Sequence, residues 1–218
     1  MNTKVLQINL RERQRTARAL DQAAKAILAG GIVIYPTETS YGMGADATNP
    51  AALKRVCDLK KRGIGKALSI ITADLGMMRE YGNISPIAEY LANAFLPGPL
   101  TLVVEKTGKL PEEISPDKSV AFRIPSNHFA RGLVGTVGRP ITATSANISG
   151  ESQIYREADV VRAFEGKVPI ILTTGDLAEV PPSTILDTRA YPPQILREGP
   201  IPWHEIKTVL DKITGEKQ

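Results

Sequence analysis

Apolar residues form two kinds of pattern along this chain, and the two kinds alternate. In several stretches they recur at steps of three and four residues, which is typical of an amphipathic helix. In others they form short uninterrupted runs, which indicate buried strands. The predicted helices cover residues 14–28, 50–60, 86–95, 127–137, 156–165 and 203–213. The predicted strands cover residues 32–35, 68–71, 100–104, 120–124, 141–143, 170–172, 184–186 and 195–196.

Residues with helix-capping chemistry support these boundaries. Gly30 follows the first helical pattern, where glycine commonly ends a helix. Asn49 before Pro50 offers a capping side chain followed by a first-turn proline. Strands and helices that alternate at this spacing indicate an α/β layered fold with a twisted, largely buried sheet. Ligands in such folds bind at the ends of strands.

Length and composition fit one domain that spans residues 1–218, with a core at about 14–202 and a helical tail at 203–218. The net charge of +4 suits an anionic ligand such as a nucleotide, or weak contact with nucleic acid. An ordinary surface that is slightly richer in lysine would give the same charge.

Several classes of protein are disfavoured. The single cysteine, Cys57, excludes a disulfide framework and a thiolate metal site. His128 and His204 lie far apart in the sequence, which argues against a zinc centre. No apolar run approaches about 18 residues, and the first residues lack the apolar segment of a signal peptide. We therefore expect a cytoplasmic protein without a membrane association.

The most polar strand-end segment runs from Thr142 to Gly150. It contains hydroxyl groups and one carboxamide but no charged residue, and it follows a predicted strand. It is too polar to be buried without hydrogen-bonding partners. We expect a loop that presents Ser145 and Asn147 to a ligand.

A second segment, residues 60–66, concentrates positive charge after a predicted helix. Lys60 supplies a point charge and Arg62 a planar fork, both suited to phosphate oxygens. A solvated charge run is the alternative, because cations at a helix C-terminus also stabilise the helix dipole. Neither a Walker A motif nor G-x-G-x-x-G is present.

Other polar groups lie at further strand ends. Thr37 lies in a predicted polar turn at residues 36–42, within the candidate segment 36–47, where hydroxyls could serve either a ligand or the turn backbone. Arg123 stands in an apolar strand and needs an anionic partner, which could be a ligand or a structural carboxylate. Ser183 enters a strand and Arg197 precedes a glycine, so both could bind phosphate.

Together these segments resemble the YrdC/TsaC-type threonylcarbamoyl-AMP synthases of the single-domain type, over about residues 14–202. The shared motifs occur in the family's order and spacing. They are Pro36-Thr37-Glu38-Thr39-x-Tyr41-Gly42, Lys60-x-Arg62, Pro97-Gly98-Pro99-Leu100-Thr101, Arg123-x-Pro125, Ser145-x-Asn147, Ser183-Thr184-Ile185 and Arg197-x-Gly199. The resemblance implies an open, twisted mixed α/β sheet flanked by helices around a large, positively charged concave cavity.

The resemblance also implies an activity. L-threonine, bicarbonate or CO2, and ATP would become L-threonylcarbamoyl-AMP and pyrophosphate, with Mg²⁺ held through the ATP phosphates and no metal site on the protein. Partner proteins would transfer the threonylcarbamoyl group to an adenosine of tRNA, to which this chain itself would bind weakly.

Residue roles follow from the same match. Lys60 and Arg62 are expected to bind the triphosphate and stabilise the departing pyrophosphate, while Thr37 and Arg123 bind threonine. Ser145 and Asn147 are expected to contact the nucleotide and the carbamate region, and with Lys60 and Arg62 they form the expected catalytic set. Further contacts to ATP are expected from Ser119, Ser183 and Arg197.

The chain departs from the family pattern at three positions. Gly63 and Ala67 stand where prolines are common, and Thr144 replaces a frequent proline. The first two are expected to loosen a loop near ATP. Competing hypotheses are an RNA-binding module without catalysis and a carbamoyltransferase that uses carbamoyl phosphate. Only 5% of the residues are aromatic, which disfavours RNA stacking.

Overall fold

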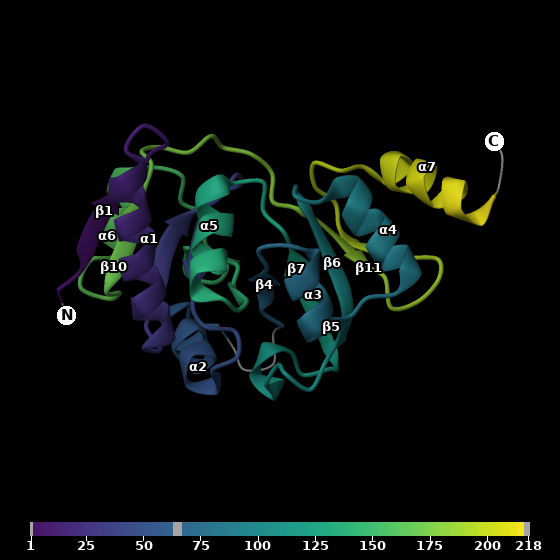
Figure 1. Ribbon diagram of the computed structural model, residues 1–218, viewed down its shortest axis with the longest axis horizontal. Coiled ribbons are helices and arrows are strands. Elements are labelled where there is room, and N and C mark those ends of the chain that lie inside the picture. Colours follow the sequence, from purple (N-terminus) through teal and green to yellow (C-terminus); the bar gives the residue numbers. More distant parts are fainter. Residues whose placement is uncertain (1, 63–66, 216–218) are drawn as a thin grey trace.

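The computed structural model describes residues 2–62 and 67–215, which form two open β-sheets with helices packed on them (Figure 1). The helices are α1 (Arg13–Leu28), α2 (Pro50–Leu59), α3 (Leu75–Tyr81), α4 (Pro86–Phe95), α5 (His128–Val137), α6 (Glu157–Phe164), α7 (Trp203–Thr214) and the 3-10 helix η1 (Glu112–Ile114). The strands are β1 (Lys4–Gln7), β2 (Val33–Pro36), β3 (Tyr41–Gly44), β4 (Ser69–Ile71), β5 (Gly82–Asn83), β6 (Leu100–Lys106), β7 (Ser119–Arg123), β8 (Ile141–Thr142), β9 (Thr144–Ser145), β10 (Ile170–Thr173), β11 (Thr184–Asp187) and β12 (Gln194–Arg197).

Both sheets are mixed. Sheet A has the strand order β1-β10-β2-β3-β9, in which the first three strands are parallel and the last two pairings are antiparallel. Sheet B has the order β12-β11-β6-β7-β4-β8, with β5 also paired to β6. The prediction of an α/β fold is confirmed, but the single predicted sheet is wrong, because the strands divide between two sheets.

The chain passes from one sheet to the other within residues 141–145. β8 pairs with β4 of sheet B, and β9 pairs with β3 of sheet A. Thr142 is fully buried at the crossing, where its Oγ1 donates to Met43 O at 2.7 Å and accepts from Ala45 N at 3.0 Å. The Tyr35 hydroxyl donates to Thr142 O at 3.0 Å. These bonds fix the two sheets against each other.

Helices cover both faces of sheet A. On one face, α1 and α5 bury Ile27 and Val134 against Val33 of β2 and Leu172 of β10. On the other face, α2 and α6 contribute residues to a second core that continues into sheet B. Figure 1 shows α1 and α6 beside β1 and β10, with α5 next to α1.

Sheet B buries only one of its faces under helices. Leu102 and Phe122 point into the core beneath α4, and α7 joins this core through the buried residues Ile206 and Leu210. Side chains of adjacent residues alternate across a strand. The neighbours of these core residues therefore face the opposite side, which is the side that lines a cavity.

Several short elements escaped the sequence prediction. They are β1, β3, α3, β5, β9 and η1. β3 begins inside the stretch expected to be a turn, at Tyr41. β1 and α7 lie outside the expected core of 14–202, yet β1 pairs with β10 and α7 is packed. None of the described helices is both long and apolar enough to span a bilayer.

Candidate functional site

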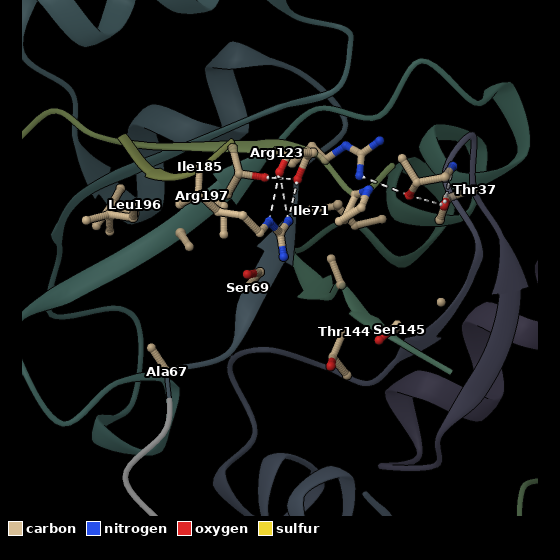
Figure 2. A pocket seen from close by; sticks show the side chains of 18 of the residues that line it. Thr37, Ala67, Ser69, Ile71, Arg123, Thr144, Ser145, Ile185, Leu196 and Arg197 are labelled. Atoms are coloured by element: carbon tan, nitrogen blue, oxygen red, sulfur yellow. Dashed lines mark hydrogen bonds between the residues drawn. The ribbon is translucent and has the colours of Figure 1, made fainter. Parts of the chain in front are cut away.

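A cavity of about 560 Å³ lies between the open face of sheet B and the edge of sheet A formed by β2, β3 and β9. This volume is in the range of small-molecule sites. Figure 2 shows Thr37 and Ser145 on one side, Ser69 and Arg197 on the other, and Arg123 between them. Sheet B contributes Ser69, Ile71, Thr101, Val103, Ser119, Ala121, Arg123, Ser183 and Ile185 to the lining.

Most of the residues expected at the site line this one cavity. They are Thr37, Arg62, Ser119, Arg123, Ser145, Ser183 and Arg197. Lys60 and Asn147 are not among its lining residues, although each of them forms a hydrogen bond with Ser145. The structure therefore brings together segments that are more than 150 residues apart in the chain.

Arg123 is almost buried at the end of β7: Nε and Nη1 donate hydrogen bonds, while Nη2 forms an ion pair but no hydrogen bond within the described residues. Nε donates to Gly98 O at 3.2 Å and Nη1 donates to Thr39 Oγ1 at 3.3 Å. Nη2 lies 2.7 Å from Glu38 Oε1. The structural ion pair that the sequence left open is thus present, and Arg123 still borders the cavity.

Thr37 organises the turn that carries Glu38. Its Oγ1 donates to Ser40 O at 2.7 Å and accepts from the backbone nitrogens of Thr39 at 3.1 Å and Ser40 at 3.2 Å. The Thr37 hydroxyl is the hydrogen-bond partner of these backbone groups. The Thr39 hydroxyl contacts Arg123 instead. The turn and the arginine therefore form one unit at the cavity wall.

Arg197, at the end of β12, and Ser183, which directly precedes β11, form a second unit. Arg197 donates to Ser183 O through Nε at 3.0 Å and Nη2 at 2.8 Å, and Nη2 also lies 3.2 Å from Ser183 Oγ. Ser183 Oγ lies 2.8 Å from Thr101 Oγ1. A Cβ at Gly199 would lie 2.4 Å from Pro182 O, so only glycine lets the segment after Arg197 pass this close.

A polar cluster beyond the other end of sheet B joins the expected residue Ser119 to Asp117 and Arg189, which the sequence reasoning missed. Asp117 Oδ1 accepts from the hydroxyls of Ser115 and Ser119, both at 2.5 Å, and Oδ2 lies 2.8 Å from Arg189 Nη1. The two hydroxyls, and then Arg189, hold the pKa of Asp117 well below its usual range. Asp117 and Arg189 both line the cavity, and no sequence pattern marked either of them.

Arg62 borders the cavity after α2. Its Nη2 donates to Ala67 O at 2.6 Å, and its Nε is buried without a hydrogen-bond partner in the described part of the chain. Gly63, the first of the expected loop-loosening substitutions, lies outside the described residues.

Lys60 is only 2% exposed, and its side chain donates hydrogen bonds to the polar segment 142–150. Its Nζ donates to Ser145 O at 2.5 Å, Asn147 O at 2.8 Å and Asn147 Oδ1 at 3.0 Å. In return, Ser149 N donates to Lys60 O at 2.9 Å. Burial, and to a lesser degree the charge of Arg62, lowers the pKa of Lys60 to about 8.

The polar segment 142–150 is therefore more buried than its composition predicted. Thr142 and Ala146 are fully buried and Asn147 is 8% exposed. A buried lysine supplies the hydrogen bonds that make this burial possible. Ser145 is the residue of the Ser-x-Asn motif that reaches the cavity.

The described residues contain no group of three or more His, Cys, Asp or Glu side chains arranged to hold a metal ion. The charged residues that line the cavity are Arg62, Arg123, Arg189, Arg197 and Asp117. This composition favours an anionic ligand over a bare cation.

Comparison with known proteins gives consistent matches over most of the chain. The model of the Sua5/YciO/YrdC family, described as telomere recombination, matches residues 25–199. A threonylcarbamoyl-AMP synthase from Pyrococcus abyssi is 38% identical over 208 residues, which are 94% of this chain. A Methanocaldococcus jannaschii relative, assigned provisionally to the same activity, is 33% identical over 199 residues, which are 91% of this chain.

The fold also matches a solved structure. Pyrococcus abyssi Sua5 in complex with L-threonine superimposes with a TM-score of 0.87 at 33% sequence identity, and the match covers all of this chain. The chain spans 65% of that solved chain and 61% of the Pyrococcus synthase, but 93% of the Methanocaldococcus relative.

Proposed function

The chain belongs to the Sua5/YciO/YrdC family, and from this premise we propose that it is a threonylcarbamoyl-AMP synthase. It joins L-threonine, bicarbonate or CO2, and ATP into L-threonylcarbamoyl-AMP, with release of pyrophosphate. Two relatives that are 38% and 33% identical carry this activity in their names, the second of them provisionally.

One observation carries the proposal. Motif residues from β2–β3, from the end of α2 and from β7, β9, β11 and β12 meet at a single cavity. The cavity is rich in arginine, as a site for a triphosphate and an amino-acid carboxylate needs to be. The rest of the lining combines apolar side chains such as Ile71 and Val103 with polar uncharged groups, which can orient neutral parts of the substrates.

The two ends of the cavity are assigned to different substrates. Arg123, which is linked to Thr37 through the hydroxyl of Thr39, binds the carboxylate of threonine. Arg62, Ser119, Ser183 and Arg197 contact ATP, with Arg62 nearest to the departing pyrophosphate. Ser145 lies where the two substrates meet.

The chemistry requires no nucleophile from the protein. The neutral amine nitrogen of threonine attacks the carbon of CO2 and loses a proton, or attacks the carbon of bicarbonate with loss of water; either route forms an N–C bond and a carbamate. A carbamate oxygen then attacks the α-phosphorus of ATP, and the bond from that phosphorus to the β-phosphate oxygen breaks. Charge builds up on the leaving pyrophosphate, so positioning and cationic contacts are the main contributions of the protein.

Mg²⁺ enters with ATP as part of the substrate complex, which agrees with a cavity whose charged lining is mainly arginine. The product is a reactive mixed anhydride, and separate transferase proteins consume it in the modification of tRNA. Contact of this chain with tRNA is weak and is not needed for the reaction.

A pyrophosphate-release assay tests the proposal. The purified protein is incubated with ATP, Mg²⁺ and bicarbonate, with and without L-threonine. Release that depends on threonine supports the assignment. Release of the same size without threonine indicates another acceptor, and no release in either reaction contradicts the synthase activity.

A further inference from the structure

Arginine side chains concentrate at the start of α1, outside the cavity, and all of them are exposed. The set is Arg11, Arg13, Arg15 and Arg18. Within the described residues, only Arg15 of this set forms an ion pair, with 3.0 Å between its Nη1 and Glu12 Oε2. Leu10, directly before the set, is 66% exposed, the largest exposed fraction among the described large apolar side chains.

Leu10 and Arg11 project from a turn that is held in place. Thr16 Oγ1, which is buried, donates to Asn9 O at 2.8 Å and accepts from Asn9 N at 3.1 Å. Asn9 Oδ1 in turn accepts from Arg11 N at 3.0 Å and Glu12 N at 2.9 Å. An apolar side chain on a fixed backbone loses little conformational entropy when a partner covers it.

The arginines do not stabilise the helix that carries them. Cations favour the C-terminal end of a helix, whereas Arg13 and Arg15 lie in the first turn of α1, which holds no acidic residue. In α6 the same chain has the favourable order, with Glu157 in the first turn and Arg162 in the last. A contact outside the chain therefore explains these arginines better than helix stability does.

α1 and α5 lie side by side and begin at the same end of sheet A (Figure 1). α1 leads through a short turn into β2, and α5 leads in the same way into β8 and β9. β2 and β9 both run antiparallel to β3, so the two helices that precede them point in the same direction. The start of α5 therefore extends the charged surface at the start of α1.

The start of α5 connects this surface to the cavity wall. Arg131 donates from Nη1 to Pro125 O at 2.8 Å and to Ser126 O at 3.0 Å. Ser126 N donates to Glu38 Oε1 at 2.7 Å, and Glu38 is the ion-pair partner of Arg123. The surface formed by Leu10, Arg11, Arg13, Arg18 and Arg131, called the arginine surface below, thus ends beside the cavity.

The composition of the arginine surface favours an acidic protein over a nucleic acid. All of its cations are arginine, which is enriched at protein interfaces, whereas lysine is depleted there. Leu10 has no counterpart on a phosphate backbone, but an apolar pocket of a protein can bury it. Residues 8–18 contain no aromatic side chain on which a base could stack.

We propose that the arginine surface docks an acidic surface of the enzyme that takes the threonylcarbamoyl group from the product. That product is a mixed anhydride, which water can cleave before an acceptor meets it. An acceptor enzyme bound beside the cavity wall shortens the path between the two active sites. The identity of the partner rests on the proposed function, whereas the surface rests on its charge, exposure and position.

A direct binding measurement tests this proposal. The probe is the threonylcarbamoyl transferase purified from the organism that encodes this chain, immobilised and titrated without substrates. Arg13→Glu combined with Arg18→Glu should bind at least about 10-fold more weakly than the wild type, because like charges then face each other. Leu10→Ser should bind about 10-fold more weakly through loss of apolar burial. Added salt should weaken binding by the wild type more than by the arginine variant.

The matched control is Arg162→Glu combined with Lys212→Glu, which makes the same change of charge on exposed residues of α6 and α7. This control should bind like the wild type. Equal binding by the wild type and the arginine variant, an equal loss in the control, or no binding by the wild type would overturn the proposal. Weaker binding of tRNA by the arginine variant, with binding of the transferase unchanged, would overturn it as well.

Pyrophosphate release separates this proposal from the proposed function. None of the substituted residues lines the cavity, so release by each variant should stay within about 2-fold of the wild type. If the wild type binds the transferase but shows no threonine-dependent release, the proposed function fails and the docking surface stands. If release depends on threonine but the transferase does not bind, the docking surface fails and the proposed function stands.

Discussion

The guanidinium of Arg123 and the carboxylate of Glu38 form an ion pair across the cavity wall, with 2.7 Å between Nη2 and Oε1. Glu38 Oε1 also accepts from Ser126 N at 2.7 Å. The pair therefore joins the turn after β2 in sheet A to the end of β7 in sheet B. It holds Arg123 in place while leaving it at the cavity surface.

Replacing Arg123 by glutamine should weaken threonine binding by about 10- to 100-fold, because one charge-assisted hydrogen bond contributes about 1.5–3 kcal/mol. Calorimetric titration with threonine measures this loss. The same change should also destabilise the fold by about 3–5 kcal/mol, since it leaves the Glu38 carboxylate with no cation in a mostly buried position.

The double variant Arg123→Gln with Glu38→Gln separates these two effects. It removes the unpaired charge, so most of the stability should return while threonine binding stays weak. Recovery of threonine binding in the double variant would contradict the role given to Arg123.

Arg62→Ala should lower turnover by about 100-fold or more, because one contact to developing charge contributes about 2.7–4 kcal/mol to transition-state stabilisation. Arg62 lines the cavity and has a buried Nε without a partner in the described residues. Steady-state pyrophosphate release measures the effect, and Lys61→Ala is the matched control. Turnover that stays within a few-fold of the wild type would rule out this role.

Gly42→Ala should destabilise the protein by about 1–3 kcal/mol. A Cβ at this position would lie 2.9 Å from Cζ of the buried Tyr35 ring, whose hydroxyl donates to Thr142 O. Urea unfolding measures the change. Gly135→Ala is the control, since its Cβ meets no atom within 4 Å and alanine in a helix should stabilise by about 0.5–1 kcal/mol.

Asp117→Asn should lower stability at pH 7, and by progressively less as the pH falls below about 4. The folded pKa of Asp117 is depressed by hydrogen bonds from Ser115 and Ser119 and by Arg189. The folded protein therefore binds fewer protons than the unfolded chain, whose aspartate pKa is about 3.9. The stabilising contribution is present above that pH and is lost as the pH falls toward the folded value.

The expected size of this effect is at most about 1 kcal/mol, because the Asp117 side chain is 53% exposed. Urea midpoints of the wild type and Asp117→Asn at pH 7, 5 and 3 give the comparison. If the stability difference between the wild type and Asp117→Asn increased toward pH 3, the predicted direction of the pH dependence would be contradicted.

The sequence predicted helix positions and site residues correctly where a strong local pattern of apolar residues marked them. Long amphipathic stretches such as α1 and α4 were placed to within a residue or two, because their periodicity is strong. Thr37, Arg123 and Arg197 were identified because each is a polar group at the end of an apolar run. The structure confirms that these three border one cavity.

What the sequence could not show depends on long-range contacts. The chain passes between the two sheets at Thr142, whose side chain is hydrogen-bonded to Met43 and Ala45, about 100 positions away in the sequence. The burial of Lys60 follows from its bonds to Ser145 and Asn147, which a charge run cannot reveal. Asp117 sits in a loop without periodicity, so nothing local marked it.

Mass spectrometry of the nucleotide product tests the central claim most directly. The protein is incubated with ATP, Mg²⁺, L-threonine and ¹³C-labelled bicarbonate. The account predicts an adenylate with the mass of threonylcarbamoyl-AMP that carries one ¹³C atom. This product should be absent without threonine and strongly reduced in Arg62→Ala and Arg123→Gln. A nucleotide product without threonine or without the label would contradict the account.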